Sequence, residues 1–189
     1  GTLGSRRARL GDTQVTIAAP LGQGMRRMDT LTLMTFVWPQ LQAVFARAPG
    51  KLLVVGSRDE LARGAQVPRN SLYLHSSRAL IGEDGSSPLL RQLVRVFTQL
   101  ESRDRSDWVV QSLTEYYASE LLRRAGGIGE VRYQVLQRRL QSEGAKVTTL
   151  RGDQVNAAQV ARGVLVLQAL DREIRLHSHD QRSLDDVTR

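Results

Sequence analysis

The sequence contains no cysteine, which excludes disulfide bonds and thiolate metal ligands and leaves the redox compartment undecided. It also contains no run of about 18 apolar residues, so we expect no membrane-spanning segment. No secretory signal is recognisable, and we favour an extracytoplasmic or periplasmic location over the cytoplasm. Aromatic residues make up only 5% of the chain, which leaves little material for stacking nucleic-acid bases.

Lysine is almost absent as well, yet the net charge is +8 because arginine is abundant. Such a basic chain raises the question of a nucleic-acid partner. The arginines are spread along the sequence instead of forming one block, so we interpret them as a solvated surface and expect no nucleic acid to bind. The alternative is a basic nucleic-acid-binding domain built from arginines of the predicted helices, namely Arg123, Arg124, Arg132, Arg138 and Arg139.

The 189 residues, 41% of them hydrophobic, are enough for one domain of ordinary size or two small lobes. Alternating apolar residues predict a strand over residues 14–19. Helical spacing predicts a helix over residues 29–47, in which Pro39 predicts a kink or a break. Short apolar runs predict further strands at residues 51–56 and 71–75.

From residue 87 onward the pattern is helical. Ser87 followed by Pro88 is typical of a helix start, and this helix is predicted to reach residue 100. Further helices are predicted over the ranges 107–124, 130–141, 155–175 and a short one near 183–186. Strands first and helices afterwards predict an α+β fold, with a small N-terminal α/β lobe of residues 1–86 and a mainly helical lobe of residues 87–189, together one domain.

Four stretches occur in the order in which one known family has them. Residues 69–71 (RNS) are similar to the end of an (E)HRNS segment. Residues 107–117 (DWVVQSLTEYY) are similar to W-x-x-E-G-(F/L)-(A/T)-E-Y-Y, and residues 162–175 to Y-x-K-G-A-L-V-L followed by L-D and I-R. Residues 183–189 (SLDDVTR) match S-L-D-D-V-(M/L)-R. The chain therefore resembles the gluzincin zinc metallopeptidases of the aminopeptidase-N and glycyl-aminopeptidase type.

This resemblance implies a thermolysin-like (zincin-like) catalytic domain with a cleft between two lobes. In active relatives an H-E-x-x-H helix and a glutamate on the next helix hold zinc, and the glutamate between the histidines is the general base. A tyrosine stabilises the oxyanion, and a further glutamate holds the free amine of the substrate. Family members usually carry a β domain before this region, so we expect the chain to be a piece of a longer protein.

At every one of these functional positions the sequence departs from the family pattern. The chain has Arg95 and Gln99 at the two histidines, Val96 at the general base, Gln111 at the third ligand, Val160 at the tyrosine and Val67 at the amine-binding glutamate. Zinc needs His, Cys or carboxylate ligands, and none of these residues supplies one. A guanidinium about 4 Å from a divalent ion would repel it by roughly 8 kcal/mol at an effective dielectric near 20.

We therefore expect a pseudopeptidase without catalytic residues, metal or cofactor. It would act as an interaction or structural module whose former substrate cleft, lined by Trp108, Glu115 and Tyr116, holds an unidentified protein or peptide. Because a buried unpaired arginine is costly, we expect Arg95 to pair with Glu115 or another carboxylate. The alternative is an active metal-dependent aminopeptidase with atypical ligands, in which His75 and the pair His177 and His179 bind the metal.

Overall fold

The computed structural model describes residues 2–22, 26–58, 69–99, 107–150 and 155–189. Contacts between residues divide the chain into two compact units. The first unit consists of residues 1–82 and 87–99, and the second of residues 83–86 and 100–189. Each unit has its own secondary structure and its own core, and each is described separately below.

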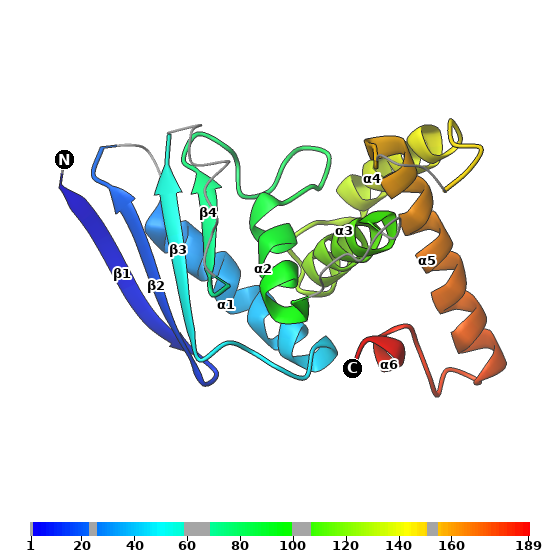
Figure 1. Ribbon diagram of the computed structural model, residues 1–189, viewed down its shortest axis with the longest axis horizontal. Coiled ribbons are helices and arrows are strands. Elements are labelled where there is room, and N and C mark those ends of the chain that lie inside the picture. The colour runs from blue at the N-terminus through cyan, green and yellow to red at the C-terminus, as the bar shows by residue number, and fades with distance from the viewer. Residues whose placement is uncertain (1, 23–25, 59–68, 100–106, 151–154) are drawn as a thin grey trace. The chain divides into compact units, whose positions relative to one another are not determined.

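The first unit is built on a four-stranded sheet in the order β1-β2-β3-β4 (Figure 1). Strand β1 (Leu3–Leu10) runs antiparallel to β2 (Thr13–Pro20), and β2 is parallel to β3 (Lys51–Ser57). Strand β3 is in turn parallel to β4 (Ser71–His75). The carboxyl ends of β2, β3 and β4 therefore meet at one edge of the sheet.

Helix α1 (Arg27–Val44) covers part of this sheet and contacts β1 and β2. Alternate strand residues such as Ile17 and Val54 are fully buried, as the period of two predicts. Of the kink or break expected at Pro39, the break does not occur, because the helix continues through the proline. Residues on both sides of the proline, Val37 and Leu41, are 0% exposed, and this packing outweighs the cost of about 3 kcal/mol of an interior proline.

Helix α2 (Pro88–Thr98) begins as the sequence predicts, because the Ser87 hydroxyl accepts a hydrogen bond from the Leu90 N–H at 3.3 Å. The helix belongs to the compact unit of the sheet, although we placed it in the helical lobe from the sequence. The side chain of Gln92 bonds both backbone groups of Tyr73 on β4, accepting from its N–H at 2.9 Å and donating to its carbonyl at 2.5 Å. Gln92 thus anchors α2 to the last strand of the sheet.

The second unit is helical, with α3 (Asp107–Arg124), α4 (Glu130–Gly144), α5 (Ala157–His177) and the short α6 (Asp185–Thr188). Helix α5 packs against both α3 and α4. Gly144 makes the α4 contact possible, since a Cβ there would lie 3.2 Å from the Arg162 backbone. The predicted α3 has the bounds that the sequence indicates, and the other three differ by a few residues.

The α+β class is confirmed: the described residues form four strands followed or interrupted by six helices. One element was missed. Strand β1 carries Arg6, Arg7 and Arg9 and is exposed along most of its length, so its sequence has no apolar alternation to find. No helix in the described ranges is long and apolar enough to cross a membrane.

Candidate functional site

Three positions that the resemblance assigns to the zinc site lie on α2 or directly after it. Arg95 is exposed in the last turn, and Val96 is 7% exposed. Gln99 follows the helix as its C-cap with a φ of 47°, and its N–H donates to the Arg95 carbonyl at 2.9 Å. In an H-E-x-x-H helix both imidazoles leave one helical face. Here the second of the two positions has left-handed backbone beyond the helix end.

The exposure of Arg95 changes one expectation. The ion pair was expected because a buried arginine needs a carboxylate to offset its desolvation. The guanidinium of the exposed Arg95 is solvated by water and has no such need. The specific pairing of Arg95 with Glu115 joins the first unit to the second, and it stays a prediction. Val67, assigned to the amine-binding position, lies outside the described residues.

The third ligand position, Gln111, is exposed on α3 in the second unit. The next residue, Ser112, is fully buried and its hydroxyl reaches the backbone carbonyl of Val160 on α5, at 3.4 Å. The structure thus brings together the segments that carry the positions which the resemblance assigns to the ligand glutamate and the tyrosine. Neither Gln111 nor Val160 offers the carboxylate or phenol that the family uses there.

Of the three residues expected to line a cleft, Tyr116 is 4% exposed and packs its ring edge-on against Tyr117, with centroids 4.9 Å apart. Burial, together with the nearby charges of Asp171 and Glu120, raises the pKa of the Tyr116 phenol, so it stays neutral at physiological pH. Trp108 and Glu115 are half-buried. Their role in a cleft stays a prediction.

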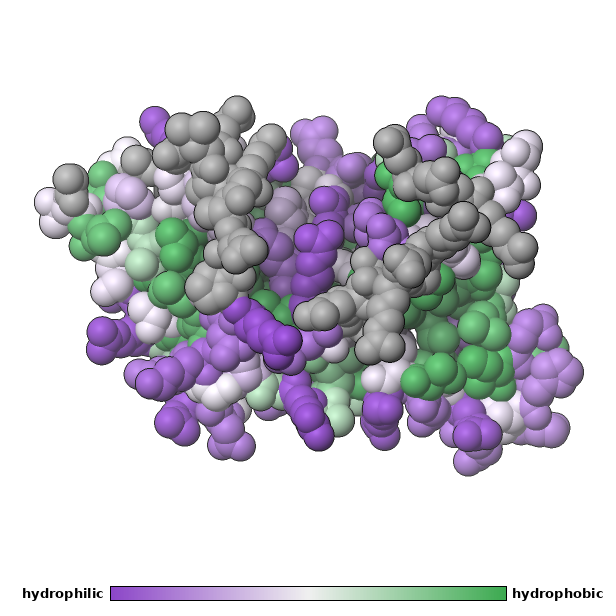
Figure 2. Space-filling model, viewed as in Figure 1, coloured by the Kyte–Doolittle hydropathy of each residue, from purple (hydrophilic) through white to green (hydrophobic). Residues whose placement is uncertain are grey.

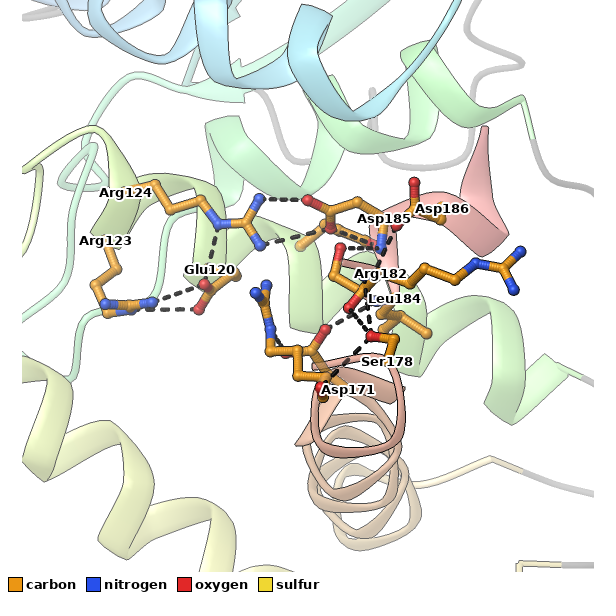
Figure 3. A network of polar contacts seen from close by, with 12 residues as sticks. Glu120, Arg123, Arg124, Asp171, Ser178, Arg182, Leu184, Asp185 and Asp186 are labelled. Carbon is orange, nitrogen blue, oxygen red and sulfur yellow. Dashed lines mark hydrogen bonds and ion pairs between the residues drawn. The ribbon is translucent and has the colours of Figure 1, made fainter. Parts of the chain in front are cut away.

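Three of the four stretches that carry the resemblance meet in the second unit. Tyr117 of the E-Y-Y segment donates its hydroxyl hydrogen to Asp185 of the S-L-D-D segment, at 3.1 Å. Arg124 at the end of α3 lies between two carboxylates, donating to Glu120 at 3.0 Å and to Asp185 at 2.8 Å (Figure 3). Burial alone lowers the pKa of Arg124, but these carboxylates outweigh burial and raise it. The network ties α6 to α3.

A second part of this network links α5 to the segment before α6. One oxygen of Asp171 accepts from the backbone N–H of Leu184 at 2.8 Å, and the other accepts from Arg175 at 2.8 Å (Figure 3). Burial raises the pKa of the Asp171 carboxyl, but these two hydrogen bonds outweigh burial and lower it. The L-D and S-L-D-D segments, separated in sequence, therefore hold each other in place.

The three histidines considered as metal ligands belong to two different units. His75 ends β4 in the first unit and its Nδ1 lies 2.7 Å from the Ser77 hydroxyl. His177 and His179 are exposed in the second unit, where His177 approaches Glu173 at 3.3 Å. In the described part of the chain, no three His, Asp or Glu side chains form a group that could hold a metal ion.

The arginines proposed for nucleic-acid binding are partly engaged within the protein. Arg123 and Arg124 both pair with Glu120, and Arg139 lies 3.9 Å from Asp84. These ion pairs neutralise charge that a phosphate backbone would need. The described residues therefore give the nucleic-acid alternative no added support.

A cavity of about 580 Å³ lies within the first unit, at the carboxyl end of β4. The start of α1, the loop after β4 and the start of α2 line it, including Arg26, Asp29, His75, Ser76, Arg78 and Gln92. From this group the sequence singles out only His75 as a candidate metal ligand. A signal was available, because the carboxyl ends of parallel strands are a common ligand site and Ser76-Ser77-Arg78 directly follows such a strand.

Neither a protein-family model nor a curated protein sequence matches this chain. Its fold is similar to the crystal structure of an aminopeptidase N family protein from Idiomarina loihiensis, with a TM-score of 0.71 and 16% sequence identity. The match covers the whole of this chain and 40% of the length of that protein. At this identity the similarity shows the fold alone.

Proposed function

We propose that this chain is a thermolysin-like peptidase domain that has lost its zinc ligands and general base and acts as an interaction or structural module. One contrast carries the proposal. Residues shared with the resembling family, such as Asp171 and Asp185, make the hydrogen bonds that hold the helices together. The residues at the family's metal positions, such as Arg95 and Gln111, are the ones that differ.

The chemistry of these positions does not fit zinc. A guanidinium donates hydrogen bonds and carries a positive charge, and an amide oxygen binds zinc poorly compared with a carboxylate. Gln99 is the C-cap residue and lies beyond the end of α2. Even a histidine at this position would therefore not share a helical face with residue 95. Val96 has no group that could accept a proton from water. No catalytic step through a metal is therefore assigned to this domain.

An interaction role is favoured by apolar surface on the second unit. Val166 and Leu170, one helical turn apart on α5, are 41% and 44% exposed. Figure 2 shows hydrophobic side chains gathered along this helix. Contiguous exposed apolar surface is more often a contact surface than a solvated one.

A hydrolysis assay tests the loss of activity. The purified chain would be incubated with aminoacyl-nitroanilides and short peptides, with added zinc and separately with a chelator. We expect no hydrolysis above the rate without protein in either condition. Hydrolysis that requires zinc would contradict the proposal. The variants His75→Ala, His177→Ala and His179→Ala, with the exposed Glu130→Gln as the control, would then show whether the atypical histidine ligands are responsible.

A further inference from the structure

The cavity at the carboxyl end of β4 lies within one compact unit and involves none of the former zinc positions. Its volume of about 580 Å³ falls in the range of small-molecule sites. We propose that it binds a small monocarboxylate with an apolar body. This inference does not depend on the proposed function.

The charges around the cavity favour a single negative charge on the ligand. Arg26 and Asp29 form an ion pair at 3.5 Å, so their charges offset each other. Arg78 is exposed and forms no ion pair with another residue that the structure describes. The guanidinium of Arg78 is therefore the one positive charge among the described lining residues that no carboxylate offsets, and its planar pair of N–H donors matches the two oxygens of a carboxylate. A phosphate dianion would exceed the charge that the site can neutralise.

Polar groups that could orient the carboxylate surround Arg78. The Ser76 hydroxyl oxygen is buried and has no hydrogen-bond partner among the described residues. A buried hydroxyl without a partner is costly, and rotation of the Ser76 side chain toward the cavity would let a ligand oxygen satisfy it. The Nδ1 atom of His75 accepts from the hydroxyl and the N–H of Ser77, at 2.7 and 3.3 Å. The proton of the neutral imidazole is therefore on Nε2, which remains a donor.

The first turn of α1 adds further donors. This helix begins at Arg27 without a side-chain cap, and the start of an α-helix leaves backbone N–H groups without intrahelical partners. Asp29 of this turn lines the cavity and its N–H belongs to these groups, whereas the N–H of Thr30, which also lines the cavity, already donates to the Arg26 carbonyl at 3.0 Å. Partial positive charge at the helix start adds to the attraction of Arg78 for an anion.

The remaining lining explains the apolar body of the ligand. Its walls include aliphatic and aromatic side chains, from Tyr73, Leu74, Ala79, Leu80, Pro88 and Leu89. A ligand that carries only a charged group would leave these walls in contact with water. A carboxylate joined to a hydrocarbon or aromatic group would fill both parts of the cavity.

The test is a titration of the ¹⁵N-labelled full chain with 3-phenylpropionate, followed by backbone amide shifts. We expect saturable shifts at Ser76, Ser77, Arg78 and Thr30. The neutral isostere 3-phenylpropionamide and inorganic phosphate should each bind at least about tenfold more weakly. No saturation at millimolar 3-phenylpropionate, or equal binding of the amide or of phosphate, would overturn the proposal.

Variants separate the cavity from general attraction to arginine. Arg78→Met should weaken 3-phenylpropionate binding about tenfold or more, while Arg172→Met, an exposed arginine on α5, should leave it unchanged. Ser76→Ala removes one oxygen without adding bulk, and it should weaken binding several-fold with an otherwise unchanged spectrum. Equal losses in Arg78→Met and Arg172→Met would show non-specific binding and refute the site.

Discussion

Asp185 is the residue on which α6 depends most directly. Its carboxylate accepts from Arg124 at 2.8 Å and from the Tyr117 hydroxyl at 3.1 Å, and its side chain is only 20% exposed. Replacing it in Asp185→Asn keeps the shape but removes the charge that Arg124 binds. We expect the free energy of unfolding to fall by about 1–3 kcal/mol, because a hydrogen bond to a charged group is lost in a partly buried place. Urea unfolding followed by circular dichroism measures the change.

Asp180→Asn is the matched control for this substitution. Asp180 is exposed in a turn with a φ of 61°, a conformation that Asn adopts readily. We expect its effect to stay within about 0.5 kcal/mol. Equal effects of the two substitutions would mean that the contacts of Asp185 contribute nothing of their own.

Asp171 predicts a dependence of stability on pH. Burial raises its pKa, but the Leu184 N–H and Arg175 outweigh burial and hold the pKa below its ordinary value. A carboxyl with a lowered folded-state pKa stabilises the fold above its unfolded pKa of about 3.9. That stability is lost as pH falls from about 4 through the folded-state pKa.

The variant Asp171→Asn cannot ionise and isolates this contribution. We expect it to be less stable than the parent at pH 7, with a difference that shrinks as the pH is lowered below about 4. Urea unfolding of both proteins from neutral to acid pH would measure the difference. A difference that stays constant over this range would show that ionisation of Asp171 is not linked to folding.

At the scale of whole elements, the crossing of α3 and α5 depends on one glycine. A Cβ at Gly163 would lie 2.0 Å from the Ser112 hydroxyl oxygen and 2.7 Å from its Cβ, so the helices could not stay in place. We expect Gly163→Ala to lower the free energy of unfolding by about 1–3 kcal/mol through overpacking. Thermal and urea unfolding would both report this loss.

Two further variants test whether the clash with Ser112 causes the loss of stability in Gly163→Ala. Gly129→Ala adds a methyl group where nothing lies within 4 Å, and we expect it to cost less than about 1 kcal/mol. In the double variant of Gly163→Ala with Ser112→Gly, the clash is gone, so the two effects should be less than additive. Additive effects would contradict a direct contact between these two positions.

The elements that sequence analysis predicted have local signals. Ser87 and Pro88 mark the start of α2, and the glycines that follow Arg124 end α3. The elements it missed or misjudged are set by packing. The continuation of α1 through Pro39 depends on buried residues on both sides, and β1 is a strand because its backbone pairs with β2. Neither cause is visible in a short window of sequence.

The candidate sites also divide into those with a signal in the sequence and those that depend on packing. Motif spacing located the positions of Arg95, Gln99 and Gln111, because a known family supplied the pattern. The cavity at the end of β4 was not predicted, since the start of α1 lines it together with residues 73–92, more than 40 positions later in the sequence. The hydrogen bond between Tyr117 and Asp185 was not predicted either, although both residues belong to recognised segments. It forms only because α6 folds back onto α3.

For the molecule as a whole, we propose that the fold has been kept while the metal chemistry has been lost. The fold is similar to that of an aminopeptidase N family protein, and the shared segments bind one another within the second unit. The positions that the resemblance assigns to zinc carry an arginine, a glutamine and a second glutamine instead of two histidines and a glutamate. We expect such a domain to keep its stability after these changes. The side chains at the assigned zinc positions are not part of the hydrogen bonds of Asp171 and Asp185 that hold the helices of the second unit together.

Metal content tests the central claim most directly. The purified chain would be analysed by elemental mass spectrometry, and its thermal unfolding recorded before and after zinc is added. We predict no stoichiometric metal and no change in the melting temperature. A zinc ion at 100 times its dissociation constant would stabilise the fold by about 2.7 kcal/mol. One zinc per chain together with a shift of that size would contradict the loss of the metal site.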